Sequence, residues 1–404
     1  MISTLAKRCY LLLAAVLLAG CLVPPAMANQ DFVNWLHAFY PQARQQGISE
    51  QTLNQAFSGV TEPDELVLDR AAYQPEFVQA LWEYLDSRVN RIAVANGLVK
   101  EDQYAATLTR LEERFGVDRT VLLAIWSMET SYGAVLAKRE RLHYIPQALA
   151  TLGWGDPKRS GFARKQLVAA LEILQNGDVR PRDMLGSWAG AMGHTQFIPT
   201  SYLAYAVDID DDGKKDIWHS IPDALGTAAN LLARNGWRSG RTWGYEVILP
   251  TGSGRWAEQT KTLGEWQRLG LIRPGGKPFF QPEDKAILKV LAGENGPGFL
   301  MLKNFFVIKR YNNSDKYALA VGLLADRLAG YDGMSRDWPR PADALSADEK
   351  IELQQLLKAK GYYQGEIDGQ LGSGSRAAIR EFEIAAGLQV NGLPSRKLLD
   401  ALRK

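Results

Sequence analysis

A glutamate occupies an apolar position of a predicted helix in the stretch WSMETSYG at residues 126–133. The preceding residues have the helical period, and Ile125 and Trp126 fall on a stripe that continues to Glu129. Gly133 predicts the end of this helix. Burial of an unpaired carboxylate costs several kcal/mol. Glu129 is therefore expected either to have a buried partner or to be a carboxylic acid with a raised pKa.

A run of small residues, GSWAGAMGHTQFIPTSY, covers residues 186–202. Gly, Ala and Ser predominate in it up to Gln196, and Pro199 suits the first turn of a new helix. Small side chains let the backbone approach a neighbour closely, and that neighbour is either another helix or a bulky ligand in a cleft. In the second case, Ser187 and Gln196 would be hydrogen-bonding groups of the cleft wall.

A third stretch, DIDDDGKKDIW at 208–218, has the spacing of a calcium loop. Carboxylates at loop positions 1, 3 and 5, a glycine at 6 and a carbonyl at 7 match the EF-hand pattern. Position 12 is His219 and not the bidentate Glu, so the loop needs another residue to close the ligand shell. The alternative is a solvated acidic turn. The predicted ligands are Asp208, Asp210, Asp212, the Lys214 carbonyl and Asp223.

The fourth stretch, KNFFVIKRYNNSDKYALAV, covers residues 303–321. We expect an apolar strand that runs into Tyr311 and Asn312, followed by a helix. Asn312 either makes a turn or lies with Tyr311 beside a cleft.

Helices predominate among the elements that must position these residues, from residue 31 to about 330. Short strand-like runs at 245–249 and 299–311 predict a small sheet. The expected fold class is α+β and predominantly helical. Apolar spacings of three and four, with a glycine near the end, indicate helices over 30–47, 76–97 and 101–116.

A linker is predicted over 331–344, where Pro, Gly and charged residues are mixed. The remaining residues, 345–404, are expected to form a separate three-helix module. The module has a faint internal echo, because the turns IDG at 367–369 and VNG at 390–392 hold corresponding places.

An export signal occupies residues 1–28, with basic residues followed by an apolar run too short to span a bilayer. Two cleavage patterns compete. The sequence Leu-Ala-Gly-Cys ending at Cys21 resembles a lipobox, which would place a lipid on Cys21, and Ala-Met-Ala at 26–28 resembles an ordinary cleavage site. We favour the lipobox, and hence a lipoprotein anchored in the outer membrane, over a soluble periplasmic protein. Both cysteines lie in this leader, so the mature chain has no internal disulfide.

Composition excludes several function classes. The chain has 404 residues, 46% hydrophobic and 23% charged, which is typical of a soluble globular protein with two or three domains. The net charge of +2 is too small to indicate a nucleic-acid-binding protein. The sequence contains no P-loop, no GxGxxG after a predicted strand and no HExxH, and its four histidines are too scattered to predict a zinc site.

The four stretches, in this order and spacing, resemble the membrane-bound lytic murein transglycosylase B family over residues 31–330. The unit at 345–404 is similar to the peptidoglycan-binding domain of many cell-wall enzymes. The resemblance implies a lysozyme-like catalytic domain, peptidoglycan glycan strands as the partner, no catalytic cofactor and a structural Ca²⁺. We expect a monomer. It also implies that Glu129 is the single catalytic residue and that the cleft residues are Ser187, Gln196, Tyr311, Asn312 and, with a looser alignment, Tyr84.

The activity that this family implies is non-hydrolytic cleavage of the N-acetylmuramic acid–N-acetylglucosamine bond. Glu129 would act first as acid and then as base, and the product would be a 1,6-anhydro-muramyl end. Burial and the C-terminal end of a helix both disfavour a negative charge at Glu129, which fits this double role. Two alternatives remain: a muramidase that uses water, and a non-catalytic wall-binding lipoprotein.

Overall fold

The computed structural model describes residues 29–72 and 79–404. The predicted export signal and Cys21 lie outside the described residues, as does the start of the helix predicted over 76–97. Within the described ranges, every helix is either too short or too polar to cross a membrane.

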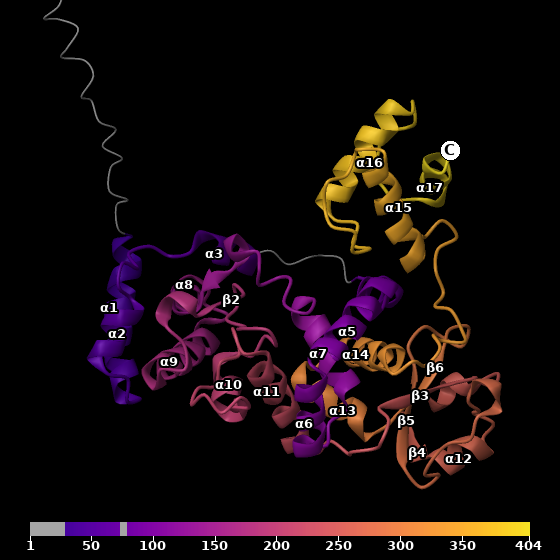
Figure 1. Cartoon of the computed structure of the whole chain (residues 1–404), viewed down its shortest axis with the longest axis horizontal. Coiled ribbons are helices and arrows are strands. Elements are labelled where there is room, and N and C mark those ends of the chain that lie inside the picture. Colours follow the sequence, from indigo (N-terminus) through magenta and orange to yellow (C-terminus); the bar gives the residue numbers. More distant parts are fainter. Residues whose placement is uncertain (1–28, 73–78) are drawn as a thin grey trace, which may run out of the picture.

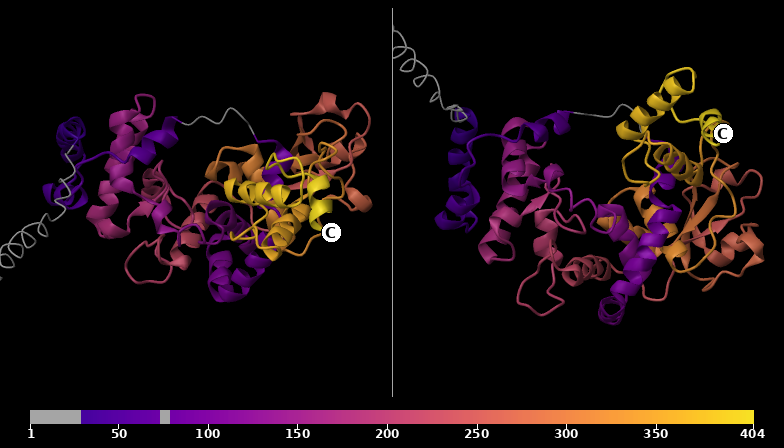
Figure 2. Two further views of the ribbon diagram at one scale, coloured as in Figure 1. Left: turned by 90° about the horizontal axis from the view of Figure 1, so that it is seen from above. Right: turned by 45° about the horizontal axis from the view of Figure 1, so that its top comes forward.

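The N-terminal part of the molecule is a group of helices at the end opposite the larger β-sheet (Figure 1, Figure 2). Helix α8 packs against α9, α3 and α1, and α9 also contacts α2 and α10. Asn29 and Ser49 cap the first two helices with side-chain oxygens that accept backbone N–H groups. The group consists of α1 (Gln30–Gln45), α2 (Glu50–Ala56), α3 (Glu65–Ala72), α8 (Ile145–Gly155), α9 (Ser160–Asn176) and α10 (Pro199–Tyr205).

The centre of the molecule is helix α7 (Arg119–Thr130), which is buried along nearly its whole length. It packs against α14, α5, α11 and α6, so four elements surround the helix that carries Glu129. The four helices that contact α7 are α5 (Arg91–Gln103), α6 (Ala105–Phe115), α11 (Ile221–Arg234) and α14 (Asp315–Leu328). Helices α4 (Leu81–Arg88) and α13 (Lys303–Tyr311) pack on α14.

Two antiparallel sheets complete the larger part of the molecule, before residue 331. A two-stranded ladder joins β1 (His143–Tyr144) to β2 (Leu185–Gly186). The larger sheet has the order β3-β6-β5-β4 and packs with α12 (Leu263–Arg268) around a second small core that includes Trp266 and Leu288. Its strands are β3 (Gly244–Val247), β4 (Thr260–Thr262), β5 (Lys285–Val290) and β6 (Gly298–Met301).

The strand predicted over 299–311 is wrong beyond Met301, because residues 303–311 form α13. A run of four apolar residues fits either a buried strand or a buried helix, and here its side chains fill the core against α14 and α11. The single helix predicted over 76–97 is also wrong. It is divided into α4 and α5 at Asn90, which caps α5 by accepting the N–H groups of Ile92 and Ala93.

The C-terminal module contains three helices, α15 (Ala347–Ala359), α16 (Ser373–Ala385) and α17 (Arg396–Leu402), around its own apolar core. The internal repeat of the module, the turns at 367–369 and 390–392, has a structural basis. Gln354 Oε1 of α15 accepts the N–H of Gly369 at 2.7 Å, and Glu383 Oε2 of α16 accepts the N–H of Gly392 at 2.8 Å. In both cases a buried side chain of the preceding helix holds the turn.

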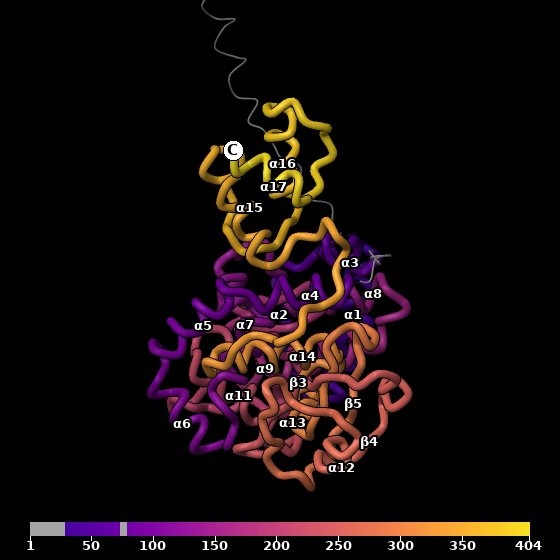
Figure 3. Tube along the Cα trace, turned by 90° about the vertical axis from the view of Figure 1, so that its right-hand side faces the viewer, coloured from indigo at the N-terminus to yellow at the C-terminus, as the bar shows by residue number. Residues whose placement is uncertain are grey.

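Residues 331–344 contain neither helix nor strand, and they contact β6 and α4. Trp338 is buried and stacks on Phe299, with ring centroids 6.0 Å apart. Farther along, Arg340 and Lys350 both pair with Asp86 of α4. Figure 3 shows the C-terminal helices at the end of the molecule where α4 and α5 lie.

The glycine pattern predicts that Gly97 ends a helix. This prediction is wrong, because Gly97 lies inside α5. A Cβ atom at this position would come within 2.5 Å of both the Leu328 side chain and the Tyr132 hydroxyl. Gly97→Ala should therefore lower the free energy of unfolding, because overpacking costs about 1–3 kcal/mol and the gain in helix propensity is only about 1 kcal/mol.

The matched control is Gly161→Ala in α9, where a Cβ atom would have nothing within 4 Å. This substitution should leave stability unchanged or raise it slightly. Denaturant unfolding of both variants checks the prediction. Equal effects of the two changes would contradict it.

Candidate active site

Glu129 lies in the last turn of α7, where the backbone changes direction sharply. Ser131, Tyr132 and Gly133 follow with φ values of 50°, 57° and 92°, all in the left-handed region. Gly133 is required for a second reason, because a Cβ atom there would lie 2.5 Å from the His194 ring. Such unusual backbone conformations gather at functional sites, where the surrounding structure holds them.

Within the described residues, one side-chain hydrogen bond holds the Glu129 carboxyl. The Tyr317 hydroxyl donates to Glu129 Oε1 at 2.6 Å. Tyr317 is 4% exposed and lies in the first turn of α14, whose N-terminus is capped by Ser314. The buried partner that the sequence analysis considered for Glu129 is therefore a phenol.

Burial raises the pKa of Glu129 to about 7. The Tyr317 hydrogen bond and the Arg88 guanidinium act in the opposite direction, since both favour the carboxylate. The balance places the group where it can both give and accept a proton near neutral pH.

Two further tyrosines lie near this carboxyl. Tyr311 stacks on Tyr317 with ring centroids 6.4 Å apart, and its hydroxyl donates to the Thr195 carbonyl at 2.5 Å. The Tyr84 ring lies below the Arg88 guanidinium, 5.3 Å from ring centroid to carbon. Burial raises the pKa of Tyr84 and Tyr311, and the Glu129 charge adds to the rise in both. The site is thus lined by neutral phenols.

The segment 186–197 is attached to the end of α7. The Thr130 hydroxyl donates to the His194 carbonyl at 2.7 Å. Backbone bridges from Gly186 to Met192 and from Met192 to Phe197 fold the segment back on itself. Small residues are needed where these backbones meet, since a Cβ atom on Gly186 would lie 2.1 Å from the Ala191 carbonyl oxygen.

The remaining predicted cleft residues lie on the segment 186–197 and directly after α13. Gln196 has a left-handed φ of 52°, and its Nε2 donates to the Gly193 carbonyl at 2.9 Å, next to the Thr195 carbonyl that Tyr311 binds. Ser187 lies at the other end of the folded segment, and its hydroxyl accepts the Ala191 N–H at 3.0 Å. Asn312 is exposed directly after α13.

Sequence reasoning missed Tyr317, Arg88 and His194. Tyr317 was within the fourth stretch, but one tyrosine in a helix gives no signal of its own. The Trp126 indole donates to His194 Nδ1 at 3.2 Å, and burial lowers the pKa of His194 to about 4, so the ring is neutral and positions the end of α7.

The predicted calcium loop forms a compact acidic turn. Carboxylate oxygens of Asp208, Asp210 and Asp212 all lie within 4.8 Å of one another. Asp208 also accepts the N–H groups of Asp211 and Gly213, which folds the loop around these oxygens. Three carboxylates at this spacing fit a hard cation such as Ca²⁺.

Asp223 has a different place from the one its sequence position suggested. It is fully buried, and its two oxygens accept the N–H groups of Ile209 at 2.7 Å and Asp216 at 2.9 Å. It therefore fastens the two ends of the loop and is not a member of the carboxylate cluster.

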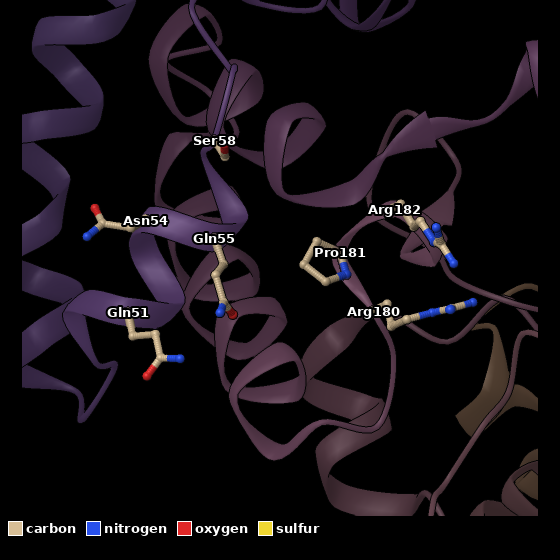
Figure 4. A pocket seen from close by; sticks show the side chains of 7 residues that line it. All are labelled: Gln51, Asn54, Gln55, Ser58, Arg180, Pro181 and Arg182. Atoms are coloured by element: carbon tan, nitrogen blue, oxygen red, sulfur yellow. The ribbon is translucent and has the colours of Figure 1, made fainter.

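A separate open pocket lies between α2 and the short 3-10 helix η2 (Pro181–Asp183). Figure 4 shows Pro181 facing Gln55 across this gap, while Arg180 and Arg182 extend away from α2. Arg180 pairs with Asp183 at 2.8 Å. With neither Glu129 nor any other acid in its lining, the pocket is not the acid–base site. Its lining residues are Gln51, Asn54, Gln55, Ser58, Arg180, Pro181 and Arg182.

Comparison with known protein families matches residues 31–326 to the transglycosylase SLT domain. The chain belongs to the transglycosylase SLT domain family. Residues 346–402 match a peptidoglycan binding domain. The resemblance to the lytic murein transglycosylases and to a wall-binding module is therefore confirmed.

Relatives of this SLT-family chain include the membrane-bound lytic murein transglycosylase B of Escherichia coli (strain K12). The two are 33% identical over 242 residues, which is 58% of this chain and 64% of that protein. The chain thus spans less than two thirds of this curated relative.

Two solved structures are informative. SltB3 from Pseudomonas aeruginosa, in complex with NAG-anhNAM-pentapeptide, is 43% identical, with a TM-score of 0.73 over 92% of this chain and 99% of that chain. The Escherichia coli lytic transglycosylase Slt35 in complex with calcium is 27% identical, with a TM-score of 0.60 over 75% of this chain and 94% of that chain. These likenesses confirm the predominantly helical, lysozyme-like α+β fold.

Removal of the Tyr317 hydroxyl should raise the pKa of Glu129 above its value of about 7, because that hydrogen bond favours the carboxylate. The change to test is Tyr317→Phe, followed by NMR titration of the glutamate carboxyl carbons with Glu129→Gln for assignment. Tyr132→Phe is the matched control, since its hydroxyl donates to the Ala93 carbonyl. A shift of similar size in both variants would refute the assignment.

A cation in the acidic loop should stabilise the fold, because it binds the native arrangement of carboxylates and not the unfolded chain. Added Ca²⁺ is expected to raise Tm and a chelator to lower it. Asp210→Asn should weaken this response. Asp211→Asn, in the same loop but outside the cluster, should keep it, since Asn tolerates the left-handed φ of 61° at that position. A Tm that does not respond to either reagent would contradict the prediction.

Proposed function

We propose that the protein is a peptidoglycan lytic transglycosylase. It cleaves the bond between N-acetylmuramic acid and N-acetylglucosamine and leaves a 1,6-anhydro-muramyl end. The observation that supports this best is the environment of Glu129, a partly buried carboxyl with a pKa of about 7 that accepts a hydrogen bond from the Tyr317 phenol and is influenced by the Arg88 charge. The ligand in the SltB3 complex, NAG-anhNAM-pentapeptide, carries an anhydro-muramyl group, which agrees with this product.

A hydrolase that uses two carboxylates needs the second one roughly 5–9.5 Å from the first. Among the described residues, the groups that shift the pKa of Glu129 are Tyr317 and Arg88, and neither is a carboxylate. This agrees with one group serving both halves of the reaction. A transglycosylase meets this condition because the substrate supplies its own nucleophile.

In the first step, protonated Glu129 donates its proton to the glycosidic oxygen. The bond from this oxygen to C1 of N-acetylmuramic acid breaks, and an oxocarbenium-like centre develops at C1. The Glu129 carboxylate that remains is stabilised by the Tyr317 hydroxyl and by the Arg88 charge.

In the second step, the Glu129 carboxylate takes the proton from the C6 hydroxyl of the same sugar. The C6 oxygen bonds to C1 and closes the anhydro ring, and Glu129 is protonated again. Water is not consumed, and no cofactor takes part. A carboxyl with a pKa near the working pH suits both steps, since neither protonation state is costly to reach.

The residues around Glu129 would hold the sugars by hydrogen bonds. Gln196 and Ser187 lie on the folded segment attached to α7, and Tyr84, Tyr311 and Asn312 come from α4 and the end of α13. We propose these five as substrate-binding residues. The module at residues 345–404, after a linker at 331–344, would bind the peptidoglycan strand as a second point of attachment.

The acidic loop is proposed as a structural calcium site made by Asp208, Asp210, Asp212 and the Lys214 carbonyl. Asp223 would act on it by fastening the loop ends. We assign it a structural role. Hydrogen bonds from the His194 N–H to the Ile217 carbonyl and from the Trp218 indole to the Leu185 carbonyl join the end of the loop to the segment that carries Gln196.

The proposed location is the periplasm, where peptidoglycan lies. Cys21 would carry the lipid of an outer-membrane lipoprotein, with cleavage after Ala28 as the soluble alternative. Metabolic labelling with a lipid precursor, with Cys21→Ala as control, separates these two forms.

Glu129→Gln should abolish release of anhydro-muropeptides from purified sacculi and leave sacculus binding intact. Loss of a general acid alone costs about 10²–10⁴-fold in rate, and here the same group also serves as base. Glu140→Gln, a substitution at an exposed glutamate, is the control and should keep wild-type turnover.

Mass analysis of the released muropeptides checks both the residue and the reaction. An anhydro product is one water lighter than the product of a muramidase. Products that carry that extra water would favour the hydrolytic alternative, and intact sacculi with bound wild-type protein would favour a wall-binding scaffold. Near-wild-type turnover by the Gln variant would rule out Glu129.

A further inference from the structure

Helix α4 presents two different faces to two different parts of the molecule. Trp82 and Asp86 are four residues apart and share one face, and Tyr84 and Arg88 share another. The first pair contacts Arg340 and Lys350. The second pair is coupled to Glu129, because the Arg88 charge lowers the pKa of Glu129 and the Glu129 charge raises the pKa of Tyr84. Helix α4 also packs on α14, whose Tyr317 donates to Glu129 Oε1. One short helix thus joins the linker and the C-terminal module to the acid–base group.

The contact on the first face is a buried ionic cluster. Arg340 Nη2 donates to Asp86 Oδ1 at 2.9 Å, and Lys350 Nζ donates to Asp86 Oδ2 at 3.1 Å. The Asp86 side chain is only 6% exposed, and the two cations also lie over the Trp82 ring at 5.3 and 4.9 Å from its centroid. Screening by solvent is weak at this degree of burial, so the cluster holds α4 firmly.

At its start the helix is tied to α14 by the Lys316 ammonium, which donates to the Gln79 carbonyl at 2.6 Å. It has eight residues, and its N-cap, Ala80, offers no side-chain hydrogen bond to the first turn. Helices of two turns are marginal in isolation and depend on tertiary contacts. The cluster at Asp86, the buried Leu85 and the packing of α4 on α14 together hold the helix in position.

We propose that Asp86 is a positioning residue through which the linker and the C-terminal module hold Arg88 beside Glu129. Arg88 is the second link, because its guanidinium rests on Tyr84 and its Nε is buried without a hydrogen-bond partner in the described part of the chain. Docking of the module thereby tunes the acid–base group. The inference deepens the proposed function and rests on Glu129 being that group.

Other groups near α7 do not replace Arg88. Tyr317 and Tyr311 face Glu129 from α14 and α13 as neutral phenols. Lys100 of α5 lies over the Trp126 ring, and the Arg119–Glu112 pair of α7 and α6 is at the far end of α7. On α11, Asp223 binds the backbone of the acidic loop and Arg234 binds the Ala204 carbonyl. Among the described groups, Arg88 is the cation that acts on Glu129.

The test is the pH profile of kcat on purified sacculi for Asp86→Ala, Arg88→Gln and the double variant. When Asp86 is replaced, α4 is no longer held and Arg88 moves away from Glu129. The pKa of Glu129 then rises because the nearby positive charge is lost, and the alkaline limb of the profile moves to higher pH by about half a unit or more. Arg88→Gln should move the limb in the same direction. Because Asp86 acts through Arg88, the double variant should show no shift beyond that of Arg88→Gln alone.

Lys138→Gln is the matched control, since it breaks another contact between the module and the catalytic part, the exposed pair with Glu366. It should leave the profile unchanged. If Asp86→Ala does not fold, the double variant Arg340→Gln with Lys350→Gln releases α4 from the other side and should give the same shift.

An unchanged alkaline limb in Asp86→Ala or in Arg88→Gln overturns the proposal, and so do additive shifts in the double variant. Muropeptide masses are measured on the same samples. Products without an anhydro end would overturn the transglycosylase assignment, whereas the shift of the limb still decides the role of Asp86.

Discussion

Removal of water from one carboxyl group is the constraint on which the site depends. The pKa of Glu129 rises from 4.5 to about 7, which corresponds to about 3 kcal/mol between its two protonation states. The sign follows from linkage: the folded state holds the proton more tightly, so stability is lost as pH rises from about 4.5 to about 7. Above that pH the whole cost is present, and the large core around α7 must offset it.

The groups around Glu129 limit the free-energy cost of its ionisation in the folded state. Tyr317 gives the carboxylate one strong hydrogen bond, and the stacked Tyr311 fixes the Tyr317 ring while it binds the Thr195 carbonyl. The Thr130–His194 bond ties the same segment to the end of α7. Helices α7, α13 and α14 and the segment 186–197 are therefore held together by the groups that surround the acid, and none of these groups brings a second negative charge.

Local pattern was sufficient where the chemistry is local. The helical stripe placed Glu129 in the last turn of a buried helix, and the Asp spacing of 208–212 gave a real carboxylate cluster. Pattern failed where tertiary contacts decide. The run at 303–311 fits a strand as well as a helix. A glycine is required at position 97 because the Leu328 side chain lies too close for a Cβ atom. Tyr317 and Arg88 reach Glu129 from distant elements, which spacing along the chain cannot reveal.

Asp86 and Glu129 are two carboxylates whose surroundings solve the same electrostatic problem in opposite ways. Asp86 receives two cations at hydrogen-bond distance, so it remains an ionic anchor. Glu129 accepts one hydrogen bond from the Tyr317 hydroxyl, and the Arg88 charge lowers its pKa only in part. The pKa therefore stays at about 7, and the group can hold a proton near neutral pH. A bidentate arginine at Glu129 would keep it ionised and remove the acid step. Because the two groups lie on α4 and α7, Arg340 and Lys350 pair with Asp86 and, among the described residues, not with Glu129.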